Sequence, residues 1–259
     1  MKYYALVAGG SKGIGFAVAA ALARRGYNLV LVARHVTNLQ SAKSLFESEY
    51  KITVEILVQD LSTPDAADKI SDFILTKKIP LKILCNVAGL GGSRDFLKLS
   101  LDDTRYMVHL NLESYMAISY KLIPVLEKNA PSYILNVGSM AGFAPIPEKN
   151  MYSATKSAVI FFSYSLRYQL KKKKISVSCL CPGPVFTKPE IIKDTMEKLG
   201  AFGKMMAVEP AKVGEIAVSG LLAAKMIITP GALSSTMAFF LRILPRRILA
   251  FVYYKLGDK

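Results

Sequence analysis

The stretch Tyr4-Ala5-Leu6-Val7-Ala8-Gly9-Gly10-Ser11-Lys12-Gly13-Ile14-Gly15 decides the fold. Its first half is continuously apolar, as expected of a strand buried on both faces. Residues 16–25 are rich in alanine, which predicts a helix. A side chain at Gly9, Gly13 or Gly15 would block the turn or keep a phosphate away from the backbone N–H groups. The stretch therefore predicts a strand, a tight turn and a helix that together receive a phosphate, although a glycine turn without a ligand remains open.

The alternation of apolar runs and helical stretches continues along the chain. Pro124 is expected to disturb one of the helices. Strands that alternate with helices form a parallel sheet covered on both faces. The predicted fold class is therefore α/β, a single-domain, Rossmann-like, doubly wound parallel sheet over residues 1–259. Strands are expected at 28–33, 53–59, 81–85, 132–139 and 176–181, and helices at 39–49, 65–76, about 101–126 and 151–172.

The composition is compatible with this fold and limits the classes of binding partner. With 259 residues, 52% of them hydrophobic, the chain can bury a full core, and its net charge of +15 favours an anionic partner. Cofactor phosphates, an acyl-CoA, a membrane surface and a nucleic acid all fit that charge, but no nucleic-acid module is recognisable. The first strand begins too early for a signal peptide, and no apolar run is long enough for a spanning helix, so a cytoplasmic protein is expected.

The cysteines and histidines do not indicate a metal site. Cys85, Cys179 and Cys181 are odd in number, and two of them lie in apolar, strand-like runs. His35 and His109 stand alone, without ligand spacing to another histidine or cysteine. We therefore expect buried, reduced thiols and no metal.

The end of the second strand indicates which dinucleotide the chain binds. In dinucleotide folds an acidic residue here bonds the adenosine ribose, whereas an arginine accommodates a 2′-phosphate. Ala33 and Arg34 supply no carboxylate, and Lys12 in the glycine turn adds a second cation. The pattern predicts NADP(H) rather than NAD(H), unless Arg34 is merely a solubilising surface residue.

Tyr152 and Lys156 are four residues apart, which places a phenol and an ammonium on one face of the expected helix. A tyrosine of ordinary pKa is a poor acid–base catalyst at neutral pH, but a nearby Lys⁺ stabilises the phenolate and lowers the pKa. Ser139, at a strand end, could bond the same substrate oxygen, and Asn111 could hold a water or a backbone group behind the lysine. Taken alone, the Tyr152–Lys156 spacing also fits an ordinary surface pair.

Together these motifs resemble those of the short-chain dehydrogenase/reductase family over roughly residues 3–190, and most of all its bacterial-type reductases. Ketoacyl and steroid reductases are more distantly similar. The motifs occur in order as Gly9-x3-Gly13-Ile14-Gly15, Asp60, Asn86-x-Ala88-Gly89, Asn111, Ser139, Tyr152-x3-Lys156 and Pro182-Gly183-x-Val185-x-Thr187. The chain departs from the family pattern at Ala8, Val87 and Gly138, none of which removes a catalytic group.

The resemblance implies a catalytic tetrad of Asn111, Ser139, Tyr152 and Lys156. Tyr152 would exchange a proton while the nicotinamide exchanges a hydride, and Lys156 would also bond the nicotinamide ribose. Asp60 and Leu61 would flank the adenine. Cofactor contacts are thus expected from Gly9, Ser11, Lys12, Gly13, Ile14, Gly15, Arg34, Asp60, Leu61, Asn86, Ala88, Gly89, Tyr152, Lys156, Pro182, Gly183, Val185 and Thr187.

The function that follows is an NADP(H)-dependent oxidoreductase that transfers a hydride between the nicotinamide and a carbonyl or secondary alcohol, on an apolar small-molecule substrate. Two alternatives remain. The chain could be a non-catalytic NADP-binding redox sensor of the same fold, or a family member with epimerase or dehydratase chemistry. The resemblance also implies a homodimer, because the helices that carry Asn111 and Tyr152 commonly pair between subunits in the family.

The C-terminal part departs from the family, whose members often close a tetramer with a short terminal strand that we expect to be missing here. Residues 188–208 form the expected substrate-loop region, and 230–259 form an amphipathic extension. Met237, Phe240, Leu241 and Leu244 would share one helical face in the first half of the extension. The extension could cover the domain or a second subunit, form a lid on an apolar substrate, or contact an anionic membrane through 234–256. We expect the extension to form part of an apolar substrate pocket and of an interface between subunits.

Overall fold

The computed structural model describes residues 2–91, 96–187 and 207–257, and its centre is a parallel sheet. The sheet has seven strands in the order β3-β2-β1-β4-β5-β6-β7, and every neighbouring pair is parallel. This confirms the predicted doubly wound α/β fold. The strands are β1 (Tyr4–Ala8), β2 (Asn28–Ala33), β3 (Val54–Val58), β4 (Leu81–Asn86), β5 (Ser132–Val137), β6 (Ile175–Leu180) and β7 (Ile227–Ile228).

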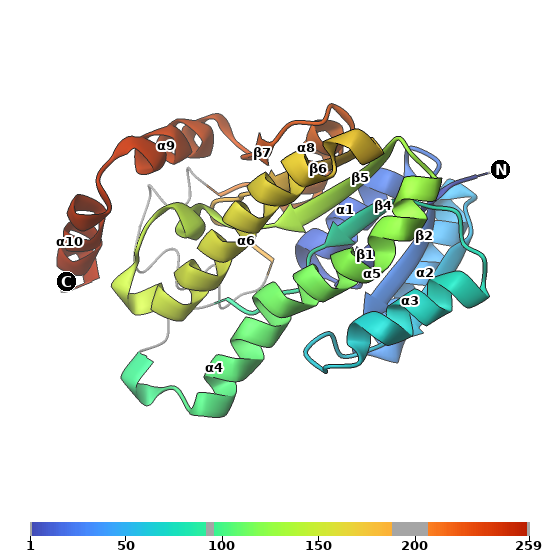
Figure 1. Ribbon diagram of the computed structural model, residues 1–259, viewed down its shortest axis with the longest axis horizontal. Coiled ribbons are helices and arrows are strands. Elements are labelled where there is room, and N and C mark those ends of the chain that lie inside the picture. The colour runs from blue at the N-terminus through green and yellow to red at the C-terminus, as the bar shows by residue number, and fades with distance from the viewer. Residues whose placement is uncertain (1, 92–95, 188–206, 258–259) are drawn as a thin grey trace.

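Helices cover both faces of the sheet (Figure 1). Those of one face, α1, α2 and α8, bury apolar side chains in one core cluster, while α3, α5 and α6 contribute to a second cluster on the other face. The helices are α1 (Gly13–Ala23), α2 (Val36–Tyr50), α3 (Ala66–Thr76), α4 (Leu101–Val108), α5 (Ser114–Lys128), α6 (Asn150–Gln169), α8 (Pro210–Leu222), α9 (Ala232–Ile243) and α10 (Arg246–Gly257). Short 3₁₀ turns lie at Phe96–Lys98, Met140–Phe143, Pro147–Lys149 and Lys171–Lys173.

The single helix expected at about 101–126 is interrupted at Asn111 rather than at Pro124. A π-helical turn, His109–Glu113, separates α4 from α5. Pro124 lies within α5 and leaves it continuous. It is exposed, so water can satisfy the carbonyl whose intrahelical partner the proline removes. A π-turn inserts one residue into the helical register, and such turns are frequent at functional sites.

Two elements near the C-terminus differ from the expectation. A short strand, β7, is present after all, and it pairs with β6 through Cys179↔Ile227 and Leu180↔Ile228. Helix α8 was not expected from the sequence. It packs against α1 so closely that a Cβ at Gly214 would lie 2.3 Å from the carbonyl oxygen of Ala17. Glycine is therefore required where the two helices meet.

The extension forms α9 and α10, which lie together at one end of the molecule (Figure 1). Ser234, Ala238 and Leu241 face the domain, so the extension does cover it in part. The stripe expected to share one face is split, because Phe240 and Leu244 are exposed while Leu241 is buried. The buried face of α9, with Ala238 and Leu241, is the one that packs against the 3₁₀ turn Met140–Phe143. Among the described residues, no helix is both long and apolar enough to cross a membrane.

Candidate active site

The glycine turn between β1 and α1 is a close-packed backbone cradle. Gly9 and Gly13 have φ values of +95° and +56°, which side chains other than glycine rarely adopt. A Cβ at Gly15 would lie 2.0 Å from the carbonyl oxygen of Gly9. The cradle thus exists only without side chains, and it fits a dinucleotide pyrophosphate at the N-terminus of α1.

Other predicted cofactor residues surround this cradle. A Cβ at Gly9 would meet the backbone of Ala88, and one at Gly13 would lie 3.4 Å from the methyl group of Thr187. The segments after β4 and β6 therefore converge on the turn after β1. Lys12 is exposed at the N-cap of α1, and Val185 is buried. Three other predicted cofactor residues are partly buried, namely Ser11, Ile14 and Thr187. The carbonyl of Pro182 accepts a hydrogen bond from Met140 N. A Cβ at Gly183 would meet Ser234 Oγ.

Asn86, also expected at the cofactor, is fully buried at the end of β4. Its Nδ2 donates to Asn136 Oδ1 at 2.9 Å and to Ser119 Oγ at 3.2 Å. Its Oδ1 has no hydrogen-bond partner among the described residues. The side chain thus ties β4 to β5 and α5, and its role towards the cofactor stays a prediction.

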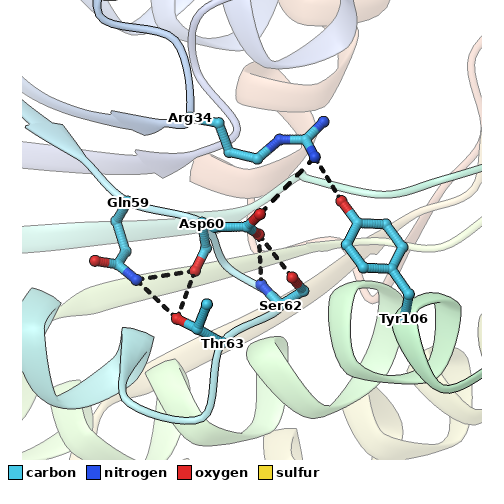
Figure 2. Close-up of polar contacts among 6 residues, drawn as sticks. All are labelled: Arg34, Gln59, Asp60, Ser62, Thr63 and Tyr106. Atoms are coloured by element: carbon cyan, nitrogen blue, oxygen red, sulfur yellow. Dashed lines mark hydrogen bonds and ion pairs between the residues drawn. The ribbon is translucent and has the colours of Figure 1, made fainter. Parts of the chain in front are cut away.

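The end of β2 carries a polar cluster that the sequence revealed only in part (Figure 2). Arg34 Nη1 donates to the hydroxyl of Tyr106 at 2.7 Å and lies 3.9 Å from Asp60 Oδ2. Asp60 Oδ1 accepts from the backbone N–H and the hydroxyl of Ser62. Tyr106 lies on α4, far from Arg34 in the sequence, and no spacing signal links the two. Leu61, expected beside the adenine, is buried in the core.

The Arg34 side chain keeps donors for an anionic ligand. The guanidinium is about half exposed, and its ion pair with Asp60 is long and open to water. Such a pair contributes little energy, so it leaves the positive charge available. Tyr106 orients the group from one side, while Asp60 is held in place by Ser62.

Tyr152, Lys156 and Ser139 meet beneath the carboxyl ends of β5 and β6. The Ser139 side chain lies close enough to the Tyr152 phenol to act on its pKa. Ser139 Oγ accepts from Ala141 N at 3.1 Å. Lys156 Nζ donates to the carbonyl of Val137, 19 positions away in the sequence, at 2.7 Å and lies 6.0 Å from the centre of the Tyr152 ring. The fold thus brings together groups that the sequence separates.

Asn111, in the π-turn, is fully buried beside this group. Its Oδ1 accepts from Leu90 N at 2.7 Å, and its Nδ2 donates to Leu90 O at 2.9 Å and to Thr155 Oγ1 at 3.2 Å. It therefore holds a backbone group, as expected. A Cβ at Gly89 would lie 3.2 Å from Asn111 Oδ1 and 3.3 Å from Lys156 Nζ, so Gly89 lets these two side chains approach each other.

Burial is the largest cause of the pKa shifts of Tyr152 and Lys156. It raises the pKa of the Tyr152 phenol, and the Ser139 side chain only partly opposes this shift. It lowers the pKa of Lys156 to about 8. The pKa of Tyr152 is therefore raised, whereas the sequence led us to expect that Lys156 lowers it. The ammonium bonds to the Val137 carbonyl, and loss of hydration is the largest influence on the pKa of the phenol.

Tyr115 is a neighbour that sequence analysis missed. Its ring centre lies 5.3 Å from Lys156 Nζ, and its hydroxyl donates to the carbonyl of Ala88 at 2.8 Å. The side chain is almost fully buried. Its place four residues after Asn111, on the same helical face, was the one available signal.

The cysteines are free and buried, as expected, and Cys179 Sγ lies 3.7 Å from Cys181 Sγ. Within residues 2–91, 96–187 and 207–257, no cluster of histidine, cysteine and carboxylate side chains could hold a metal ion.

The apolar pocket expected from the extension and the 188–208 region is only partly described. Its proposed members Ile191, Ile192, Met196, Leu199, Phe202, Met205 and Met206 lie outside the described residues. Helix α10 does line a groove of about 500 Å³, through Arg246 and Ala250. That groove borders Ser153, Ala154 and Ser157 of α6, a different side of the helix from Tyr152 and Lys156.

Comparisons with known proteins give relatives that act on carbonyl compounds. The chain is 32% identical over 200 residues to very-long-chain 3-oxoacyl-CoA reductase-A of Danio rerio, covering 75% of this chain and 62% of that protein. It is 29% identical over 238 residues to the 3-oxoacyl-[acyl-carrier-protein] reductase of Bos taurus, covering 89% and 98%. It thus spans less than two thirds of the zebrafish relative.

A solved structure of similar sequence has the same fold as this chain. The short-chain dehydrogenase from Sphingobium yanoikuyae, solved in complex with NADPH, superposes with a TM-score of 0.78 at 26% identity, covering 94% of this chain and 97% of that one. The family model described as short chain dehydrogenase matches residues 3–197. The chain therefore belongs to the short-chain dehydrogenase family.

Proposed function

We propose that this protein is an NADP(H)-dependent oxidoreductase that interconverts a carbonyl group and a secondary alcohol. The observation that carries the proposal is the convergence of the buried Ser139, Lys156 and Asn111 with the partly buried Tyr152 in one cluster. A buried ammonium beside a phenol is costly to maintain unless it has a task, since burial destabilises the charged form of the lysine. A redox sensor of the same fold would have no use for them.

The side chains divide the acid–base work. Ser139 Oγ already accepts from Ala141 N, so its own O–H is free to rotate towards Tyr152 or a substrate oxygen. The Tyr152 hydroxyl donates the proton to the carbonyl oxygen during reduction and accepts it during oxidation. Bound NADPH supplies the hydride. The bond to Val137 uses one of the three donors of Lys156, and the others are available to the cofactor ribose and to the proton path.

NADPH rather than NADH is the proposed cofactor because of Arg34. Its guanidinium is half exposed at the end of β2, where the 2′-phosphate of the adenosine ribose would lie in a doubly wound fold. Lys12, exposed at the N-cap of α1, adds a second positive charge to this side of the cradle. The first turn of α1 contains no acidic residue to repel a phosphate. The Sphingobium relative was itself solved with NADPH.

An apolar carbonyl compound is the proposed substrate, and a 3-oxoacyl thioester is the first class to test. The curated relatives from Danio rerio and Bos taurus are named for reduction of such thioesters. A carrier with phosphate groups would also suit a chain of net charge +15.

A homodimer through α5 and α6 belongs to the same proposal. These helices expose large apolar side chains along one line each, Met116 and Tyr120 on α5 and Phe161, Tyr164 and Tyr168 on α6. Exposed apolar surface of this extent usually marks an interface. The two helices also carry or adjoin the catalytic cluster, so pairing them would brace it.

The test is a panel of 3-oxoacyl thioesters of increasing chain length, a polycyclic ketone and a small polar ketone, with NADPH consumption followed by absorbance. We expect the rate of turnover to increase with the apolar character of the substrate. The Tyr152→Phe variant should have lost most of this activity. A protein that binds NADPH tightly but turns over none of these compounds would instead be a sensor. Turnover with only the small polar ketone would refute the proposed substrate class.

A further inference from the structure

Helices α9 and α10 present an apolar surface that the domain does not cover. Six of its side chains, here called the tail surface, are between 44% and 63% exposed: Phe239, Phe240, Ile243, Ile248, Phe251 and Val252. They come from the solvent side of both helices, opposite the buried Ala238 and Leu249. Large apolar side chains exposed in this number on two consecutive helices call for a partner.

The tail surface is held in a defined position. Arg246 Nη1 donates to the carbonyl oxygens of Phe143 and Leu241, at 2.7 Å each, and so fixes the corner between the two helices to the domain. The Arg242 guanidinium lies 4.8 Å from the centre of the Phe143 ring. The surface is therefore a preformed part of the fold, and a partner would not have to order it.

The charged residues of helices α9 and α10 themselves have one sign. Residues 232–257 contain four basic residues and no acidic one. Arg247 and Lys255 are exposed, and neither forms an ion pair among the described residues. Lys255 Nζ lies 5.6 Å from the ring centre of Tyr254 and 6.0 Å from that of Phe251. Cations beside exposed aromatic rings suit a boundary between apolar and anionic material.

We propose that the tail surface docks on an anionic lipid bilayer, with its apolar side chains at the level of the acyl chains and its cations at the lipid headgroups. A second copy of this chain fits less well, because a two-fold interface through α9 and α10 would bring the same cations together, and neither helix carries an acidic residue to match them. A spanning mode is not available to helices of 12 residues each. An amphipathic helix with a basic margin is the form that lies in the membrane interface.

The experiment is co-sedimentation of the full chain with vesicles of phosphatidylcholine alone, or with phosphatidylglycerol replacing part of it. We expect binding to the anionic vesicles that weakens with added salt. Arg247→Glu with Lys255→Glu should lower the partition coefficient by about tenfold or more, since each cation near the surface contributes about fivefold. Phe239→Ser with Phe251→Ser should cause a loss of similar size by removing inserted rings.

Matched controls carry the same changes away from the tail surface. They are Leu45→Ser with Leu75→Ser on α2 and α3, and Lys212→Glu with Lys225→Glu on and after α8, all at exposed positions. They should bind vesicles within about twofold of the wild type. NADPH affinity and thermal unfolding, measured for every variant, separate this result from the proposed function and from misfolding.

Three outcomes would overturn the inference. The first is equal binding to neutral and anionic vesicles. The second is an equal loss of binding in the tail variants and their controls. The third is a wild type that does not sediment with vesicles while the phenylalanine variants change its oligomeric state, which would make the tail surface a protein interface.

Discussion

Replacing Arg34 with alanine should convert the cofactor preference without disturbing the fold. The proposed bond between the guanidinium and a 2′-phosphate is charge-assisted and contributes about 1.5–3 kcal/mol. Its loss should raise the dissociation constant of NADPH by about 10- to 150-fold. NADH has no 2′-phosphate, so its dissociation constant should stay within about twofold. The ion pair of Arg34 with Asp60 is long and exposed, so the free energy of unfolding should change by less than about 1 kcal/mol.

Tyr106 supplies an internal check on this prediction. Tyr106→Phe removes only the hydroxyl that accepts from Arg34 Nη1 at 2.7 Å. Losing one hydrogen bond of about 0.5–1.5 kcal/mol should weaken NADPH binding by about 2- to 12-fold. Because Tyr106 acts through Arg34, the same change made in the Arg34→Ala background should have almost no effect.

The assay is isothermal titration of each purified protein with NADPH and with NADH. This gives both dissociation constants without requiring turnover or a known substrate. A wild type that binds NADH more tightly than NADPH would refute the role of Arg34, and so would an Arg34→Ala variant that loses affinity for both cofactors equally. Additive effects of the two substitutions would show that Tyr106 does not act by orienting Arg34.

Three further predictions concern the catalytic cluster and the assembly. Tyr152→Phe should lower kcat by about 10²-fold or more while NADPH affinity is retained, because only the proton donor is lost; near-normal turnover would exclude Tyr152 from that role. Burial lowers the pKa of Lys156 to about 8, below its value of about 10.4 in the unfolded chain. Between these two pH values the unfolded chain therefore binds more protons than the folded one. The contribution of Lys156 to the free energy of unfolding thus rises with pH from about 8 to about 10.4. The difference in unfolding free energy between the cofactor-free wild type and Lys156→Met should therefore shift in favour of the wild type over that range, and a flat difference would contradict the burial of a charged lysine. Phe161→Glu, at an exposed position of α6, should shift sedimentation from dimer to monomer with little change in melting temperature, whereas an unaltered dimer would place the interface elsewhere.

Local sequence patterns were sufficient for the framework, whereas the proposed catalytic tetrad came from the resemblance to a known family. A strand buried on both faces, a turn that needs positive φ and a helix of good formers are each determined over a few residues, so Gly9, Gly13 and Gly15 indicated their turn directly. The parallel sheet then followed from the alternation of elements. Because the carboxyl ends of parallel strands meet at one edge, Ser139 could be placed near Tyr152 and Lys156 from the amino-acid sequence, and the family resemblance added Thr187.

Contacts between distant segments could not be predicted in this way, because no local period encodes them. The bond from Arg34 to Tyr106 joins residues 72 positions apart. Asn111 in the π-turn is bonded to the backbone of Leu90, a contact that exists only once the loop after β4 has folded against this turn.

Burial decided the remaining differences, because it depends on the whole packed molecule. The sequence identified Tyr152 and Lys156 as a pair but not the desolvation that raises the pKa of one and lowers that of the other. It identified an amphipathic extension, yet the packing against Met140–Phe143 determined that Leu241 is buried while Phe240 is exposed. Side-chain chemistry and local backbone preferences are properties of the chain; which of its apolar faces loses its water is a property of the tertiary structure.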